Sequence, residues 1–541
     1  MDEENTESVD LPPEIWTQIF THFLPSEPEG IFQQHLPQQE DCKDSLRDLR
    51  TFCLVSRRWR LTAQPILYKN VIIDNPSRHG LDMKLLRTLA LTPELASKVR
   101  TCKLLDVGRQ GQGVEKLLAA IIRSIQVPHR YRNLLRAHLL DKYRPPSEGL
   151  AGITLALATK ARRIEVSPGP QPYGLIWMLS GSLDVQEGDP ESFYRFPKPT
   201  EWSNVTTIQG EVAKGINSLP SYLPRARDPS EADIRIYDAR AFANYGLPHL
   251  TDLHLNFENE DNRLVDLAAI RLLFHHPSLE ILRLSNINWL IDSEEDMEYQ
   301  SMETDYHPIE NKIHTIDLRN SAVNAFSIRH ILTNFSSLRY FSVELHDFNL
   351  WRPREDEDIH DKMWNFESAE FGTALRRHGR SLVELRLETW QYYYDDWERG
   401  MSRAFGSLAR IPLRRLEIEL HELVPGYNNL ANDEIEVLMS VLPLELEELT
   451  ILGPNRNILT GIGSFLRNCF SRPLRMVNLE MIDSSPLDES ETKEIDGWIM
   501  EQDCRYTRTA AGRDLIRFVS FVKVRVPRPT HSGTKPALAV G

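Results

Sequence analysis

The chain has 541 residues, of which 41% are hydrophobic and 26% are charged, and its formal net charge is −15. This length exceeds what one hydrophobic core supports, so we expect either several domains or an elongated array whose units bury only their neighbours. The acidic balance argues against nucleic acid as a partner, because cations that neutralise phosphates supply most of the affinity for nucleic acid.

The first ten residues, MDEENTESVD, are acidic and polar. A secretory signal has a positive segment followed by an apolar one, so residues 1–10 are predicted to be a disordered N-terminus rather than a signal. No apolar run elsewhere is long enough to span a bilayer, and we expect no membrane partner. The five cysteines lack CxxC and zinc-ligand spacings, which is typical of reduced thiols in a cytoplasmic and/or nuclear protein without a metal site.

An amphipathic helix is predicted directly after this segment. Its apolar residues recur at the spacing that stacks side chains on one helix face, and they are Leu11, Ile15, Ile19, Phe20 and Phe23. Prolines 12 and 13 stand in the first turn, where a missing N–H costs least.

A second apolar stripe, from Leu49 to Trp59, predicts another helix. Arg57, Arg58 and Arg60 crowd its end, where cations suit the negative end of the helix dipole. Two helices of this size bury too little surface to form a core alone.

The order of these residues resembles the F-box, whose pattern begins Leu-Pro-x-Glu-Ile, continues Ile-Phe and closes on Val-Ser-Arg-x-Trp before Leu-Tyr. The matching residues are Leu11, Pro12, Glu14, Ile15, Ile19, Phe20, Val55, Ser56, Arg57, Trp59, Leu67 and Tyr68. The resemblance implies a small all-α F-box over residues 11–70. Residues 25–48 separate its halves by more than the family usually allows and are interpreted as an insertion. The alternative is that these helices only cap the following domain.

Residues 71–166 are predicted to hold degenerate leading leucine-rich repeats. The segments VRTCKL and ARRIEV place apolar residues at their first, fourth and sixth positions, which is the strand signature of such repeats. Helices are predicted between the strands at residues 81–91, 114–125 and 131–140. Residues 167–249 then become rich in Pro and Gly, which predicts an irregular insertion or, alternatively, a linker between two arrays.

Residues 250–482 repeat the strand signature eight times, in segments that start at residues 250, 279, 313, 338, 382, 413, 446 and 474. The helices predicted between them lie at residues 264–274, 323–335, 368–377, 397–409, 434–442 and 463–470. This alternation is similar to leucine-rich repeat proteins with one strand and one helix per repeat, which implies an α/β solenoid. A doubly wound α/β domain is the alternative, but no glycine-rich phosphate loop is found.

The repeats are predicted to be irregular. The family often places Asn or Cys beyond the sixth position to bond the turn, and here those places hold Glu258, Ile287, Ser321, Trp390 and Pro454. We therefore expect no asparagine ladder, that is, no series of Asn side chains that bond the turns of successive repeats. A helix at residues 489–501 and the apolar stretch LIRFVSFVKV predict a C-terminal cap at residues 483–524, followed by a disordered tail at residues 525–541.

An acidic stripe follows the strands of the later repeats, on the positions that point out of the core. A loop dense in aromatic residues, WQYYYDDW, lies beside it. Both features suit capture of a protein with a basic segment, because complementary charge and aromatic anchors favour association. The predicted target-binding residues are Tyr340, Glu384, Glu388, Trp390, Tyr392, Tyr394, Glu417, Glu419 and Glu448.

An F-box followed by leucine-rich repeats resembles the substrate-recognition subunit of an SCF-type cullin-RING ubiquitin ligase. The expanded spacing and the degenerate repeats resemble those of fungal F-box proteins. The resemblance implies a Skp adaptor as partner and, through it, cullin and RING subunits. The residues expected to contact the adaptor are Leu11, Pro12, Ile15, Ile19, Phe20, Leu54, Val55 and Trp59. No catalytic residue, metal site or cofactor is predicted.

Three alternatives remain open at this stage. The chain can use the adaptor for scaffolding without degradation, or it can be a plain interaction protein without a ligase role. An enzyme hidden in residues 167–245 would need a clustered reactive site there, and the sequence offers none.

Overall fold

The computed structural model describes about half of the chain, with gaps. The described ranges are residues 11–23, 39–73, 81–105, 115–125, 147–168, 247–257, 276–291, 312–345, 368–389, 405–419, 432–452, 462–471, 473–481, 505–511 and 513–519, together with isolated positions between 175 and 179, 264 and 274, at 423, and between 493 and 497. The chain divides into two compact units. Unit one comprises Met1–Leu382 and Arg386–Trp397, and unit two comprises Val383–Leu385 and Glu398–Gly541.

Unit one begins with three helices, α1 (Pro13–Thr21), α2 (Gln39–Val55) and α3 (Arg57–Leu67). The predicted single helix around residues 49–59 is wrong, because the chain leaves the helical conformation at Ser56. Ser56 has φ −153° and ψ 162°, and its hydroxyl accepts a hydrogen bond from the Trp59 N–H, as an N-cap residue does. Part of the predicted insertion at residues 25–48 is also helical, since α2 starts at Gln39.

This break changes the role of the arginines that follow it. Arg57, Arg58 and Arg60 lie in the first turn of α3 and not at the end of a helix, so the helix-dipole explanation is wrong. Two of them bond to backbone carbonyls outside α3 instead. Arg58 Nη2 donates to the Leu11 carbonyl at 3.0 Å, and Arg60 Nε donates to the Cys53 carbonyl, in the last turn of α2, at 3.1 Å.

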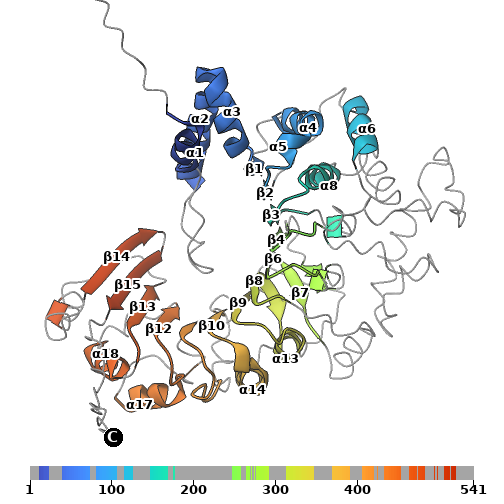
Figure 1. Ribbon diagram of the computed structural model, residues 1–541. Coiled ribbons are helices and arrows are strands. Elements are labelled where there is room, and N and C mark those ends of the chain that lie inside the picture. The colour runs from blue at the N-terminus through green and yellow to red at the C-terminus, as the bar shows by residue number, and fades with distance from the viewer. Residues whose placement is uncertain are drawn as a thin grey trace, which may run out of the picture. The chain divides into compact units, whose positions relative to one another are not determined.

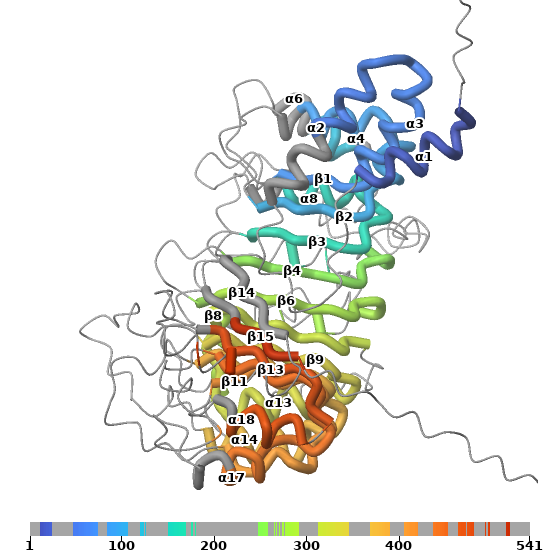
Figure 2. Tube along the Cα trace, turned by 90° about the vertical axis from the view of Figure 1, so that its left-hand side faces the viewer, coloured from blue at the N-terminus to red at the C-terminus, as the bar shows by residue number. Residues whose placement is uncertain are grey.

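A mostly parallel sheet forms the rest of unit one, and its strands pair in the order in which the chain reaches them (Figures 1 and 2). The strands are β1 (Asn70–Ile73), β2 (Thr101–Leu104), β3 (Arg163–Val166), β4 (Asp252–Asn256), β6 (Ile281–Ser285), β8 (Thr315–Val323), β9 (Tyr340–Leu345) and β10 (Glu384–Glu388), the last of which shares its residues between the two units. Each strand from β1 to β9 is parallel to the next. A second small sheet joins β5 (Val265–Asp266) to β7 (Ile287–Trp289), and β7 to the end of β8.

Helices connect many of these strands. They are α4 (Leu81–Leu91), α5 (Pro93–Ala96), α6 (Glu115–Ser124), α8 (Ser147–Leu157), α13 (Ala325–Asn334) and α14 (Ser368–His378), with a 3-10 turn at Gly379–Ser381. Helices α4, α6 and α8 lie on the same side of the strands in Figure 1. The predicted helices at residues 81–91, 114–125, 323–335 and 368–377 are confirmed, and the one at residues 131–140 lies outside the described residues.

The predicted helix at residues 264–274 is wrong. Its first residues form β5, where the Val265 N–H donates to the Asn286 carbonyl at 2.9 Å. The described positions after β5 adopt 3-10 or turn geometry. A backbone that is already committed to a strand pairing cannot also start an α-helix, although the apolar spacing suits one.

The core of unit one consists of the apolar residues at the first, fourth and sixth positions of the predicted segments. Leu253 of β4, Leu282 of β6 and Ile316 of β8 are fully buried and occupy adjacent register positions across the sheet. The same holds for Leu255 and its register partners on β6 and β8. The strand predictions for this unit are therefore confirmed, and the fold is a mixed α/β one with a large, mostly parallel sheet and helices.

Two asparagines bond the turns after β4, β6 and the first part of β8. Asn286 and Asn320 have positive φ angles of 61° and 46°, a conformation that asparagine tolerates better than most residues. Asn286 Nδ2 donates to the Phe257 carbonyl, and Asn320 Nδ2 donates to Asn286 Oδ1. The expectation of no asparagine ladder is thus wrong for these turns, since the bonding residues stand one position before Ile287 and Ser321.

Unit two contains three parallel strands, β11 (Arg415–Glu419), β12 (Glu448–Leu452) and β13 (Met476–Met481), and the helices α17 (Asn432–Val441) and α18 (Ile462–Phe470). Strand β15 (Arg513–Val519) lies antiparallel to β13 and pairs with β14 (Arg505–Ala511). Part of the predicted cap, LIRFV, is therefore a strand that covers the edge of β13. The helices predicted at residues 434–442 and 463–470 are confirmed, whereas residues 405–409 are not helical and the rest of the 397–409 prediction lies outside the described residues.

Several predicted segments fall largely outside the described residues. These include residues 1–10, the insertion at 167–249 apart from a few positions, the helix at 489–501 apart from three positions, and the tail at 525–541. Within the insertion, Leu175, Ile176 and Leu179 are described and buried. Among the helices that are described, none combines the length and apolar character required to cross a bilayer.

The asparagine ladder leads to the first testable prediction. Asn286→Ala should lower the free energy of unfolding by about 2 to 3 kcal/mol, because it removes two hydrogen bonds and places a less tolerant residue at positive φ. Chemical denaturation of the intact chain measures the change. Asn334→Ala is the matched control, since Asn334 is exposed and bonds only within its own helix, and a change below about 0.5 kcal/mol is expected there. Equal effects of both substitutions would contradict the role assigned to Asn286.

Candidate functional site

An aromatic cluster holds the three N-terminal helices together. Phe20 of α1 is 1% exposed, and its ring centroid lies 5.1 Å from that of Phe52 and 5.7 Å from that of Trp59. Trp16 stacks against the same group, with its ring centroid 4.6 Å from that of Trp59. Leu49 completes the centre, with no exposed surface. Four aromatic rings in mutual contact give this small unit a specific packing that apolar area alone does not provide.

The residues predicted to contact an adaptor divide between this cluster and the surface. Phe20 is interior, so it holds the helices together and is not available to a partner. Ile19 and Trp59 are half-buried and pack against the cluster. Pro12, Ile15, Leu54 and Val55 are exposed, and Leu11 is half-buried.

The exposed apolar side chains of this unit are large. Leu54 is 79% exposed, Val55 is 58% exposed and Ile15 is 39% exposed. Leu61 on α3, which the sequence interpretation missed, is 68% exposed. Its neighbours in the sequence are polar, so no apolar stripe drew attention to it. Helices α1 to α3 thus present apolar side chains to solvent next to an interior that is already filled by aromatic rings.

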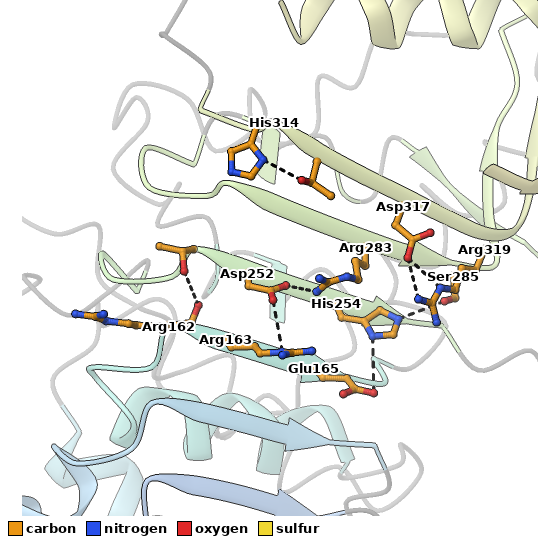
Figure 3. A network of polar contacts seen from close by, with 12 residues as sticks. Arg162, Arg163, Glu165, Asp252, His254, Arg283, Ser285, His314, Asp317 and Arg319 are labelled. Carbon is orange, nitrogen blue, oxygen red and sulfur yellow. Dashed lines mark hydrogen bonds and ion pairs between the residues drawn. The ribbon is translucent and has the colours of Figure 1, made fainter. Parts of the chain in front are cut away.

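A second group of functional candidates is the polar face of unit one, which is defined by the outward side chains of β2, β3, β4, β6 and β8. Figure 3 shows the part of it on β3 to β8. The members of the polar face are Lys103, Arg163, Glu165, Asp252, His254, Arg283, Ser285, Asp317 and Arg319. The strand register places Lys103, Glu165, His254, Arg283 and Asp317 in one row across five strands. Sequence interpretation did not select these residues, although the alternation of polar and apolar positions places them opposite the core.

Ion pairs between neighbouring strands connect the polar face. Lys103 Nζ lies 2.9 Å from Glu165 Oε1, and His254 Nδ1 lies 3.7 Å from the same oxygen. Asp252 accepts a hydrogen bond from Arg283 Nη1, and its other oxygen lies 3.5 Å from Arg163 Nε. Each of these contacts joins two different strands.

The pair between Asp317 and Arg319 lies within strand β8. Arg319 Nε and Nη2 both donate to Asp317 Oδ2, at 3.0 and 2.9 Å. Burial raises the pKa of Asp317, but the charge and hydrogen bonds of Arg319, with a hydrogen bond to Ser342, outweigh it and leave the pKa below its usual value. Asp317 is therefore ionised.

His254 is neutral at neutral pH. Its pKa is lowered to about 4, mainly by burial and also by the Arg319 and Arg283 charges, against the raising effect of Glu165 and Asp317. The imidazole therefore adds no charge to the polar face above pH 5.

The polar face also places a carboxylate, an imidazole and a hydroxyl in sequence. His254 Nε2 lies 3.4 Å from Ser285 Oγ, while its Nδ1 faces Glu165. Such an order occurs in hydrolases, where the imidazole accepts the hydroxyl proton. Here both contacts are long, and the neighbouring arginines disfavour the imidazolium that this step creates. The geometry therefore does not favour a nucleophilic Ser285.

The residues predicted to bind a target are largely paired with arginines of the same chain. In unit one, Glu388 is 3% exposed and accepts a hydrogen bond from Arg386 Nη2 at 2.8 Å. In unit two, Arg415 bonds both Glu384 Oε2, at 3.1 Å, and Glu448 Oε2, at 2.6 Å. The charges of these three carboxylates are thus partly neutralised by arginines of the same chain. The acidic stripe in the sequence did not reveal this pairing.

The remaining predicted target-binding residues vary in exposure. Glu419 is 3% exposed and so does not present its carboxylate to a partner, whereas Glu417 is half-buried. Tyr340 is half-buried, and its ring centroid lies 6.0 Å from that of His314 in an edge-to-face arrangement. The aromatic loop residues Trp390, Tyr392 and Tyr394 lie outside the described residues.

Neither a metal site nor a reactive thiol is found in the part of the chain that the structure describes. No group of three or more His, Cys, Asp or Glu residues there is arranged to hold a metal ion. Cys53, Cys102 and Cys469 are free thiols, and burial raises the pKa of Cys102 to about 12, so its thiolate form is not accessible.

Comparison of the sequence with protein-family descriptions and with curated proteins gave no match. The functional argument for this chain therefore depends on its own residues.

The neutral state of His254 gives a second testable prediction. Its folded pKa is lower than the usual 6.5, so the unfolded state binds the extra proton first and stability falls as the pH drops from 6.5 towards 4. Between pH 7 and pH 5, the parent chain should lose about 2 kcal/mol more stability than His254→Gln. Denaturant unfolding at both pH values measures this. His22→Gln, at an exposed position, is the control and should follow the parent, and parallel curves for the parent and His254→Gln would contradict the prediction.

Proposed function

We propose that this chain is the substrate-recognition subunit of an SCF-type cullin-RING ubiquitin ligase. Its F-box, residues 11–70, binds a Skp adaptor, and an irregular leucine-rich repeat solenoid with a strand and a helix in most repeats binds the protein to be modified. The chain then carries no ubiquitin and performs no chemistry. It accelerates transfer by holding its target near the enzyme that the cullin and RING subunits bring.

One observation carries the proposal. The apolar residues of helices α1 to α3 separate into an aromatic interior, centred on Phe20, and side chains that remain in solvent, namely Ile15, Leu54 and Val55. A helical unit that only capped the following sheet would turn its apolar residues towards that sheet. Large apolar side chains left exposed beside a filled interior instead favour a partner that buries them, at a gain of about 1.5 to 3 kcal/mol for each one fully covered.

The remainder of the chain supports the recognition role. Consecutive strands pair in chain order with one buried and one outward row of side chains, as a leucine-rich array requires, and such an array offers an extended surface to another protein. The outward rows of unit one are rich in charged groups, which give specificity more than affinity. Such a role places the chain in the cytoplasm and/or the nucleus, where cullin-based ligases assemble.

Adaptor capture tests the proposal. The intact chain should co-purify with a Skp adaptor, and the double variant Ile15→Asp with Leu54→Asp should reduce the captured adaptor at least tenfold, because two charged groups would have to be buried in an apolar contact. Both positions are exposed, so the fold should be retained, and thermal unfolding checks this.

Leu91→Asp is the matched control, since Leu91 is also an exposed leucine, 70% exposed, but lies on α4 outside the helical unit. It should capture the adaptor as the parent does. If the folded parent chain captures no adaptor, the ligase role is wrong, and the chain is a non-catalytic leucine-rich repeat interaction protein whose N-terminal helices have another purpose.

A further inference from the structure

The charges of the polar face do not balance at Asp252. Among the described residues, this carboxylate is the only ion-pair partner of two guanidinium groups, Arg163 on β3 and Arg283 on β6. Arg283 is almost fully buried, and its Nε has no hydrogen-bond partner in the described part of the chain. A buried guanidinium that shares its counter-ion leaves uncompensated positive charge in a region where water screens it weakly.

The rest of the polar face does not supply the missing negative charge. Lys103 is matched by Glu165, and Arg319 is matched by Asp317. His254 is neutral at neutral pH. Asp317 and Glu344 on β9 both act electrostatically on Arg319, and Asp317 also acts on Arg283. Within ion-pair distance, however, the two guanidinium groups at Asp252 face that one carboxylate.

The uncompensated charge is accessible through Arg163. Its side chain is 32% exposed, whereas the side chains of Asp252 and Arg283 are 13% and 3% exposed. Figure 3 shows the Arg163 and Arg283 side chains both in contact with Asp252, and they come from the two strands that flank β4. A ligand that approaches this point thus meets Arg163 first, with Arg283 behind it as a fixed positive charge.

We propose that the polar face binds an anionic group of the captured protein at Arg163, either a carboxylate of an acidic segment or a phosphoryl group. The planar guanidinium donates two parallel hydrogen bonds to either group, and the buried Arg283 charge adds attraction without the entropy of ordering a side chain. The inference deepens the proposed function, on which it rests, by naming a chemical class for the target. The anionic group proposed here is distinct from the basic segment that the acidic stripe predicts, because that stripe lies on the later strands.

Free anions test the site without a known target. The intact chain is titrated with inorganic phosphate or with acetate at constant ionic strength, with sodium chloride as the reference, and binding is followed by the rise in melting temperature. Phosphate or acetate should stabilise the chain beyond chloride, and the comparison of the two identifies the preferred group.

Two variants test whether the anion binds at Arg163, and they should change its affinity in opposite directions. Arg163→Gln should weaken anion binding at least fivefold, because it removes the accessible donor. Asp252→Asn should strengthen it at least fivefold, because it removes the competing carboxylate and keeps a hydrogen-bond acceptor for Arg283. A merely damaged fold does not produce this gain. Arg162→Gln is the control, since Arg162 is an exposed arginine directly before β3, and it should bind as the parent does.

The proposal is overturned if neither anion stabilises the parent more than chloride, or if Arg163→Gln and Asp252→Asn both bind as the parent does. Adaptor capture by the same variants separates this result from the proposed function. Arg163→Gln should capture the Skp adaptor normally, so loss of anion binding with normal capture concerns the polar face alone. Failure of capture by the parent with intact anion binding would instead overturn the ligase role.

Discussion

The parallel pairing of consecutive strands is the constraint on which the rest of this structure depends. Because each strand lies beside the next in register, residues two apart in one strand become rows that run across several strands. Leu253, Leu282 and Ile316 form one such row in the core. The alternate positions form rows on the outside, so a side chain there meets side chains that are 30 to 90 positions away in the sequence. Both the stability of the sheet and the chemistry of its outer face follow from this arrangement.

The outer rows show how charged groups are accommodated at low exposure. A charge taken from water costs free energy unless a partner and hydrogen bonds replace the water. Arg319 with Asp317 and Lys103 with Glu165 meet this requirement, and Arg386 with Glu388 does so on a later strand. His254 meets it differently, by remaining neutral. Asp252 stands out because it serves two arginines, and this imbalance is where a ligand can contribute what the chain lacks.

The sequence predicted most strands of this fold correctly because they share one pattern. In each of them the apolar side chains at the first, fourth and sixth positions of the segment are buried in the core. The prediction failed where one hydrogen bond decides the backbone. The hydroxyl of Ser56 splits the second predicted helix, and the bond from Val265 to Asn286 replaces a predicted helix by a strand. Neither bond changes the apolar spacing on which the prediction relied. The ladder of Asn286 and Asn320 was missed by one position for the same reason.

The candidate sites were predicted less well, because their properties depend on neighbours that are distant in sequence. Glu384 and Glu448 read as free carboxylates along the chain, yet a single arginine, Arg415, bonds both of them across adjacent strands. The sequence therefore identified the carboxylates of the acidic stripe, but it did not show that Arg415 pairs with two of them.

In the N-terminal helices, by contrast, local packing leaves large apolar side chains exposed to solvent. Phe20, Phe52 and Trp59 fill the small interior, and the ties from Arg58 and Arg60 fix the helices to one another. Leu54 and Val55 are not part of this interior and are 79% and 58% exposed. This remaining apolar surface is available for a second molecule, and the free energy of covering it contributes to association rather than to folding.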